Sequence, residues 1–138
     1  MIRRTLISVL IVAATGVALP ASAAAQESIY GVWRNPKNSV HIDIQPCGQY
    51  LCGRVVWAND NAREDARKGG TKELIGSQLL RNFSPGKGGA WKGKVFVPDL
   101  NVTVSGSAEL LDSSTLRARG CLFAGLACKA QNWKRVES

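Results

Sequence analysis

Polar and apolar residues alternate along most of the chain after residue 30, which is the period of a β-strand with one face in water. Residues 39–45 alternate without a fault. The longest alternating segment begins at residue 102, and one of its faces carries mostly small side chains: Val102, Val104, Gly106, Ala108 and Leu110. Turn-forming residues separate such segments at short intervals. The pattern predicts eight or nine short antiparallel strands joined by hairpin-length links.

Residues 59–70 interrupt this alternation, because they are polar or charged and have no apolar stripe. We expect a surface loop there, with one helical turn around residues 62–67. Residues 51–57 form a predicted strand that places Trp57 on the same face as Val55. No segment predicts a long helix, so the expected fold class is all-β.

Aromatic residues mark the first and last predicted strands, as Gly31-x-Trp33 and Trp133-x-Arg135. Shared character at the two ends of a sheet favours closure, and a closed sheet leaves no edge open to aggregation. We therefore predict a closed antiparallel barrel in which Gly31, Trp33, Trp133 and Arg135 close one end, with Arg135 lying across the Trp33 ring. Trp57 and Trp91 would then flank the opposite opening.

Residues 1–25 have the pattern of a secretory signal peptide, with Arg3-Arg4, an apolar run over residues 6–19 and small residues before the cut. Cleavage is expected after Ala23 or Ala25. The apolar run is shorter than the roughly 20 residues that a membrane-spanning helix needs. We predict one exported periplasmic domain, residues 26–138, without a transmembrane segment.

All four cysteines lie in the exported part, where oxidation favours disulfides. Pairing of Cys47 with Cys52 and of Cys121 with Cys128 is favoured, because each pair brackets a turn-rich stretch. The alternative is a metal site, but these spacings and a single His41 do not match zinc-ligand spacings. No metal and no cofactor is predicted.

The chain carries 18 basic and 10 acidic residues, and loss of Arg3 and Arg4 with the leader leaves 16 basic ones. Several gather in two expected loops: Arg63, Arg67, Lys68 and Lys72, then Lys87, Lys92 and Lys94. Such charge attracts anionic envelope surfaces, or simply aids solubility. An exported protein does not meet nucleic acid, so that partner is excluded.

Catalytic residue sets are not recognisable in the sequence. His41 stands alone on the polar face of a strand, and Glu64 and Asp65 lie in the charged loop. Ser105 lies within a strand rather than at the strand-to-helix turn of a nucleophile elbow. The sequence therefore does not predict an enzyme.

A set of motifs resembles the bacterial domain-of-unknown-function family 2147 over about residues 29–136. The motifs are Gly31-x-Trp33, Cys52-Gly53-Arg54-Val55-Val56-Trp57, Leu74-Ile75-Gly76, Leu79-Leu80, Trp91-Lys92-Gly93-Lys94, Pro98-Asp99, Thr115-Leu116-Arg117-Ala118-Arg119-Gly120-Cys121 and Trp133-Lys134-Arg135. The resemblance implies a small exported protein with a lipocalin-like (calycin) barrel. Ligand binding follows from it only by analogy.

The leading hypothesis is a periplasmic, non-enzymatic barrel that binds a small apolar or amphipathic molecule. Its expected interior lining is Val102, Val104, Gly106 and Ala108, with Trp57 and Trp91 near the mouth. The alternative is an envelope interaction protein that uses the basic loops and the apolar loop between Cys121 and Cys128. Its partner would be anionic lipid, cell-wall polymer or a protein. The sequence does not predict an oligomeric state.

Overall fold

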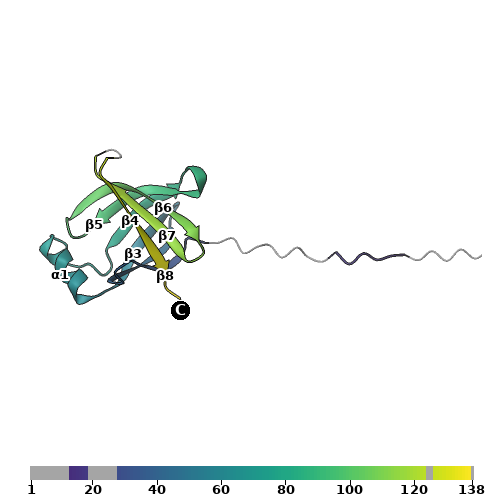
Figure 1. Ribbon diagram of the computed structural model, residues 1–138, viewed down its shortest axis with the longest axis horizontal. Coiled ribbons are helices and arrows are strands. Elements are labelled where there is room, and N and C mark those ends of the chain that lie inside the picture. Colours follow the sequence, from purple (N-terminus) through teal and green to yellow (C-terminus); the bar gives the residue numbers. More distant parts are fainter. Residues whose placement is uncertain (1–12, 19–27, 124–125, 138) are drawn as a thin grey trace, which may run out of the picture.

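The protein is a closed barrel of eight antiparallel strands, each hydrogen-bonded to its neighbours in sequence order (Figure 1). The computed structural model describes residues 13–18, 28–123 and 126–137. The strands are β1 (Gly31–Arg34), β2 (Val40–Cys47), β3 (Tyr50–Ala58), β4 (Gln78–Pro85), β5 (Trp91–Val97), β6 (Val102–Asp112), β7 (Thr115–Cys121) and β8 (Cys128–Arg135). The predicted closed antiparallel barrel is confirmed.

Closure of the barrel joins β1 to β8, with Trp33 opposite Arg135 and Arg34 opposite Lys134. Most of the predicted leader lies outside the described residues, so its cleavage stays a prediction. None of the helices in the described ranges is long and apolar enough to cross a bilayer.

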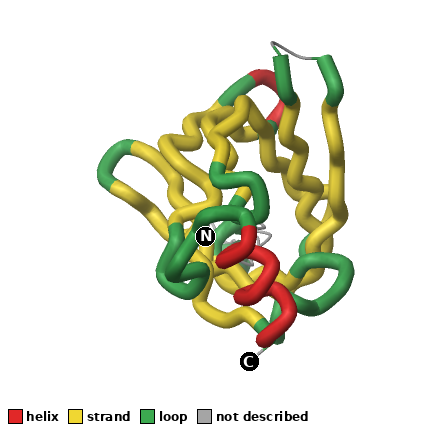
Figure 2. The backbone as a smooth tube through the Cα atoms, turned by 90° about the vertical axis from the view of Figure 1, so that its left-hand side faces the viewer, coloured by secondary structure: helices red, strands yellow, loops and turns green. Residues whose placement is uncertain are grey.

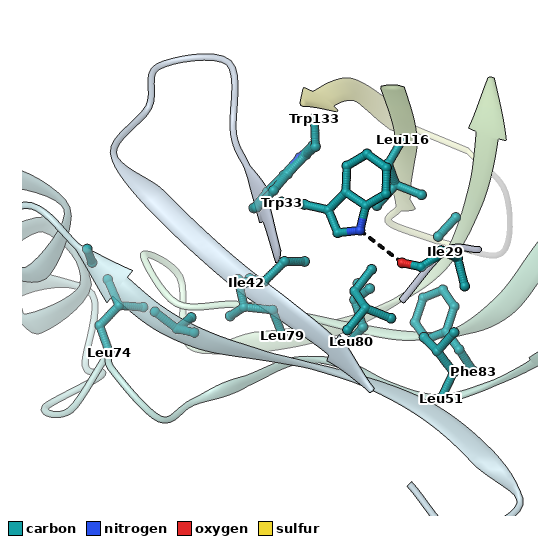
Figure 3. Packing of buried hydrophobic residues seen from close by; sticks show 14 of the residues in the cluster. Ile29, Trp33, Ile42, Leu51, Leu74, Leu79, Leu80, Phe83, Leu116 and Trp133 are labelled. Carbon is teal, nitrogen blue, oxygen red and sulfur yellow. Dashed lines mark hydrogen bonds between the residues drawn. The ribbon is translucent and has the colours of Figure 1, made fainter. Parts of the chain in front are cut away.

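The core fills the barrel on the side of β1 to β4, and Trp133 and Leu116 complete it from β8 and β7 (Figure 3). Alternation in β2 turns Ile42 and Ile44 inward, as the sequence pattern requires. The largest fully buried side chains are Trp33, Phe83, Ile44, Leu51, Leu116 and Val55. These residues pack the barrel solidly at the end near Trp33, which is how small barrels are stabilised.

Helix α1 (Asp60–Lys68) replaces the surface loop that was predicted with one helical turn. Its N-terminus is capped by Asn59, whose side chain accepts a hydrogen bond from the Ala62 N–H at 2.9 Å. Ala66 is the only buried residue of α1, so the helix contacts the barrel through a small side chain. For the same reason the sequence of this segment shows no apolar stripe. Figure 2 shows α1 lying across one end of the barrel.

A bulge in the β2–β3 pair reverses the predicted orientation of Trp57. Val55 lies opposite Ile42, whereas Trp57 lies opposite His41, so Val56 is an extra residue in the ladder. One inserted residue moves the following side chains to the other face. The prediction that Trp57 shares a face with Val55 is therefore wrong, and the Trp57 ring packs on the His41 ring with centroids 4.6 Å apart.

Two disulfides join neighbouring strands at hairpin ends, with the predicted pairing. Cys47–Cys52 links β2 to β3 with a Cα–Cα distance of 5.6 Å. Cys121–Cys128 links β7 to β8 at 4.0 Å. Each bridge closes a short loop, so each restrains one hairpin rather than tying distant parts of the barrel together.

Candidate functional site

One end of the barrel is covered by the N-terminal segment, which we define as residues 28–30. The Ile29 side chain is buried, and its carbonyl accepts a hydrogen bond from Trp33 Nε1 at 2.9 Å. Arg135 donates from Nη1 to the Tyr30 carbonyl at 2.8 Å and from Nη2 to the Ser28 carbonyl. One arginine from the last strand therefore fixes the segment that precedes the first strand.

Arg135 also lies over the Trp33 ring, with its guanidinium carbon 4.2 Å from the ring centroid. The Arg135 Nε donates to the Ser113 carbonyl at 2.8 Å, which anchors the guanidinium to the β6–β7 turn as well. The Trp33 and Arg135 pair therefore lies at one closed end of the barrel. The planar guanidinium group of Arg135 donates hydrogen bonds from several of its nitrogen atoms at once.

A hollow of about 500 Å³ opens beside this closed end, between the N-terminal segment and β5–β6. We call it the mouth hollow. Its lining combines aromatic and aliphatic side chains with a few polar groups: Ser28, Ile29, Tyr30, Gly88, Gly89, Trp91, Glu109 and Leu110. Trp91 was expected at the end opposite to Trp33, and that placement is wrong because strand β5 begins, rather than ends, at this rim.

The apolar wall of the mouth hollow consists of side chains from three parts of the chain. Trp91 lies opposite Ala108 in the β5–β6 ladder, and Leu110 follows on the same face of β6. Tyr30 is 39% exposed, so its ring is accessible at the rim. Gly88 and Gly89 both have positive φ, 68° and 77°, which allows the short η1 turn (Lys87–Gly89) between β4 and β5 to form part of the lining.

The predicted interior lining does not form one surface with Trp91. Val102 lies at the far end of the same ladder, opposite Val97, and is 39% exposed. Val104 is half-buried, and Ala108 is fully buried in the core. The space beside Gly106 is not free, because an added Cβ would lie 2.3 Å from Val95 Cγ2.

Two ionisable side chains outside the mouth hollow, His41 and Asp99, have shifted pKa values. The pKa of His41 is lowered by burial against its neighbours and by the charge of Arg34. Burial and the nearby Asp65 raise the pKa of Asp99 in the β5–β6 turn, against the opposing effect of Lys37. Across the described residues, no three His, Cys, Asp or Glu side chains gather as a metal site would require.

The basic loop expected around residues 63–72 is partly neutralised within α1. Arg67 Nη1 lies 2.7 Å from Glu64 Oε2, and Arg63 Nη1 lies 3.8 Å from Asp60 Oδ1. Both pairs are exposed, so they contribute little to stability. These ion pairs do reduce the positive electrostatic potential around the helix, and with it the attraction of an anionic partner.

A closed eight-stranded antiparallel barrel of this kind is a lipocalin-like fold. Among solved structures, the protein HP1028 from the human pathogen Helicobacter pylori, which belongs to the lipocalin family, is similar with a TM-score of 0.63. The two share 12% sequence identity, and the match covers 80% of this chain and 84% of that chain. Such a likeness establishes the fold alone.

The chain belongs to the family described as an uncharacterized protein conserved in bacteria (DUF2147), whose model matches residues 31–135. This confirms the family resemblance inferred from the motifs. No curated protein matches the chain.

Proposed function

We propose that the protein binds a small amphipathic molecule in the mouth hollow, with Trp91 as the main contact. The observation that carries the proposal is the hollow itself, whose volume of about 500 Å³ suits a small ligand and whose wall combines the side chains of Trp91, Tyr30 and Leu110 with polar groups. Aromatic rings at the mouth of a barrel offer a large apolar surface with little conformational entropy to lose.

The polar groups of the hollow specify the amphipathic character of the ligand. Ser28 offers a hydroxyl, and Gly88 and Gly89 offer backbone groups, while Glu109 lies at the rim of the hollow. An apolar body would lie against Trp91, while the hydrogen-bonding groups of the ligand would face Ser28 and the backbone of Gly88 and Gly89. Arg135 supports this arrangement indirectly, because it holds the carbonyl of Tyr30 and so preforms one wall.

The proposed role is binding without catalysis, in the periplasm. Among the described residues that line the hollow, Glu109 is the one carboxylate residue, and none is a histidine, cysteine or lysine. Two disulfides are typical of proteins outside the reducing cytoplasm. The predicted leader supports export, and the lipocalin-like barrel is an architecture that often holds small ligands.

Native mass spectrometry of the exported protein from its own periplasm would identify the bound molecule. A fluorescent hydrophobic dye then serves as a probe for titrations. We expect Trp91→Ala to weaken dye binding about tenfold or more, as truncation of a central aromatic contact does. Trp57→Ala is the matched control, because that tryptophan lies outside the barrel against His41 and should leave dye affinity unchanged.

The interior lining predicted from the sequence gives the competing location. Val104→Trp would obstruct a ligand bound along Val102 and Val104 but would not reach the mouth hollow at the other end of the ladder. Loss of binding in Val104→Trp with normal binding in Trp91→Ala would overturn the proposed site. A protein that carries no molecule and binds no dye would overturn the function.

A further inference from the structure

Strand register gathers cations from β4 to β7 on the outer face of the barrel. Arg81 lies opposite Lys94, and Lys92 lies opposite Ser107, which in turn lies opposite Arg119. These positions alternate with inward residues such as Ala108, so their side chains share the outward side. We define the basic face as Arg81, Lys92, Lys94, Arg117 and Arg119.

The basic face is not neutralised by acidic side chains. Within the described ranges, ion pairs join residues of α1 only. Glu109, opposite Arg117, is the one acid in the ladder positions that face these cations. Arg81 instead lies over the Phe96 ring at 4.4 Å, and Lys94 donates to Ser105. Like charges directly opposite each other, as Arg81 and Lys94 are, destabilise a sheet, so this arrangement favours an anionic partner.

An exposed apolar cluster extends the basic face at the end of the β7–β8 hairpin. Strand β7 runs from Arg117 and Arg119 to Cys121, and the chain continues into what we call the hairpin tip: Leu122, Phe123 and Leu126. Phe123 is 80% exposed and Leu126 71% exposed. The Cys121–Cys128 disulfide holds the base of this tip. In Figure 1 the hairpin projects beyond the body of the barrel at the upper left.

We propose that this surface docks on a bilayer containing anionic phospholipid, with the hairpin tip inserted among the lipids and the basic face against the headgroups. Basic side chains near an anionic membrane surface each contribute about 1 kcal/mol, or about fivefold in affinity. Apolar side chains of an amphipathic surface enter the boundary between headgroups and acyl chains. A hydrophilic anionic polymer would match the cations but leave Phe123 and Leu126 without an apolar environment.

The hairpin tip and the mouth hollow lie at opposite ends of the barrel, and the basic face extends between them, with Lys92 and Arg117 near the rim of the hollow. Strand β5 leaves the hollow at Trp91, β6 returns to that rim at Asp112, and β7 then carries the chain to the opposite end, where the hairpin tip lies. The side chains that insert among the lipids are therefore at the other end of the barrel from the mouth hollow. The inference does not depend on the proposed ligand.

Flotation of the exported protein with lipid vesicles tests the proposal. One set of vesicles contains phosphatidylethanolamine alone, and the other also contains phosphatidylglycerol. We expect binding only to the second set and loss of binding at high salt, because the attraction is screened. The triple variant Lys92→Gln, Arg117→Gln and Arg119→Gln should bind about 100-fold more weakly, since three cations are lost.

The matched control removes three cations from the region of α1: Arg63→Gln, Lys68→Gln and Lys72→Gln. It changes the net charge equally and should retain binding within a few-fold. A second variant, Phe123→Ser with Leu126→Ser, keeps all charges and should also lose vesicle binding. These side chains are exposed, so thermal unfolding should match the parent protein.

Three results would overturn the proposal. Equal loss in the two triple variants would mean that net charge alone drives association. Unchanged binding of the Phe123 and Leu126 variant would mean that nothing inserts into the bilayer. Binding to a soluble anionic polymer but to neither set of vesicles would assign the face to a different partner.

Discussion

The guanidinium of Arg135 lies over the ring of Trp33, 4.2 Å from its centroid, and the two residues also face each other across the β1–β8 pair. This one contact joins the last strand to the first. The same guanidinium holds the carbonyls of Ser28 and Tyr30, so it couples closure of the sheet to the segment that covers its end.

Replacing Arg135 by alanine removes the contact with Trp33 and three hydrogen bonds to carbonyls. We expect the free energy of unfolding to fall by about 2 kcal/mol, after allowing for partial exposure of the side chain. Arg135→Lys keeps the charge but cannot reach several carbonyls at once, so it should be intermediate. Urea unfolding measures all three proteins. A lysine variant as stable as the parent would show that the fork geometry is unimportant.

Gly106→Ala should destabilise the barrel by about 1 to 3 kcal/mol, because a side chain is forced into a packed position. Its Cβ would lie 2.3 Å from Val95 Cγ2 and 2.6 Å from the Arg119 carbonyl oxygen. Gly120 lies directly opposite Gly106 in the β6–β7 ladder and provides the control. Its added Cβ would approach only Val104 Cγ2, at 3.3 Å. Thermal unfolding should therefore show a smaller loss for Gly120→Ala.

Stability should decrease on acidification through the titration of His41. The pKa of His41 is lowered in the folded protein, so the unfolded chain binds the proton more tightly. The contribution of His41 to the free energy of unfolding is complete above its pKa in the unfolded chain, about 6.5. This contribution is lost as the pH falls below that value toward the lower pKa of the folded protein. The chain has one histidine, so His41→Gln should remove this slope from the unfolding free energy. If the His41→Gln variant kept the same dependence of unfolding free energy on pH, that dependence would come from carboxylates instead.

Each disulfide should contribute about 2 kcal/mol, because the closed loops are short. The sequence separations are 5 for Cys47–Cys52 and 7 for Cys121–Cys128. We expect serine pairs at either bridge to lower stability by similar amounts. Only the Cys121→Ser, Cys128→Ser pair should also weaken vesicle binding, since it releases the hairpin tip. Equal effects of both pairs on vesicle binding would contradict the assigned role of the tip.

The fold was predictable because its signals are local. Alternation identifies the strands, and the Gly31-x-Trp33 and Trp133-x-Arg135 pair indicates closure. The disulfide partners follow from short spacings around turns. Helix α1 was underestimated because only Ala66 is buried, and alanine at a single position leaves no apolar stripe to detect.

The placement of side chains on the barrel was less predictable, because it depends on register. The bulge at Val56 turns Trp57 outward. No feature of the sequence of residues 51–57 indicates that the ladder contains an extra residue. Trp91 was assigned to the wrong end for a related reason: a predicted count of eight or nine strands does not fix the direction in which the strand that begins at Trp91 runs. Likewise, Arg81, Lys94 and Arg119 are distant in sequence and become neighbours only through the ladders of β4 to β7.

The contacts of Arg135 with Ser28 and Tyr30 span 107 and 105 positions along the chain. A growing polypeptide that has not yet reached β8 lacks both the Arg135 guanidinium that lies over Trp33 and the strand that pairs with the free edge of β1. Contacts between such distant positions form slowly, because a large loop must close first. The order of synthesis therefore keeps the seam between β1 and β8 open until the final strand is available, so the barrel closes only after the whole chain has been made.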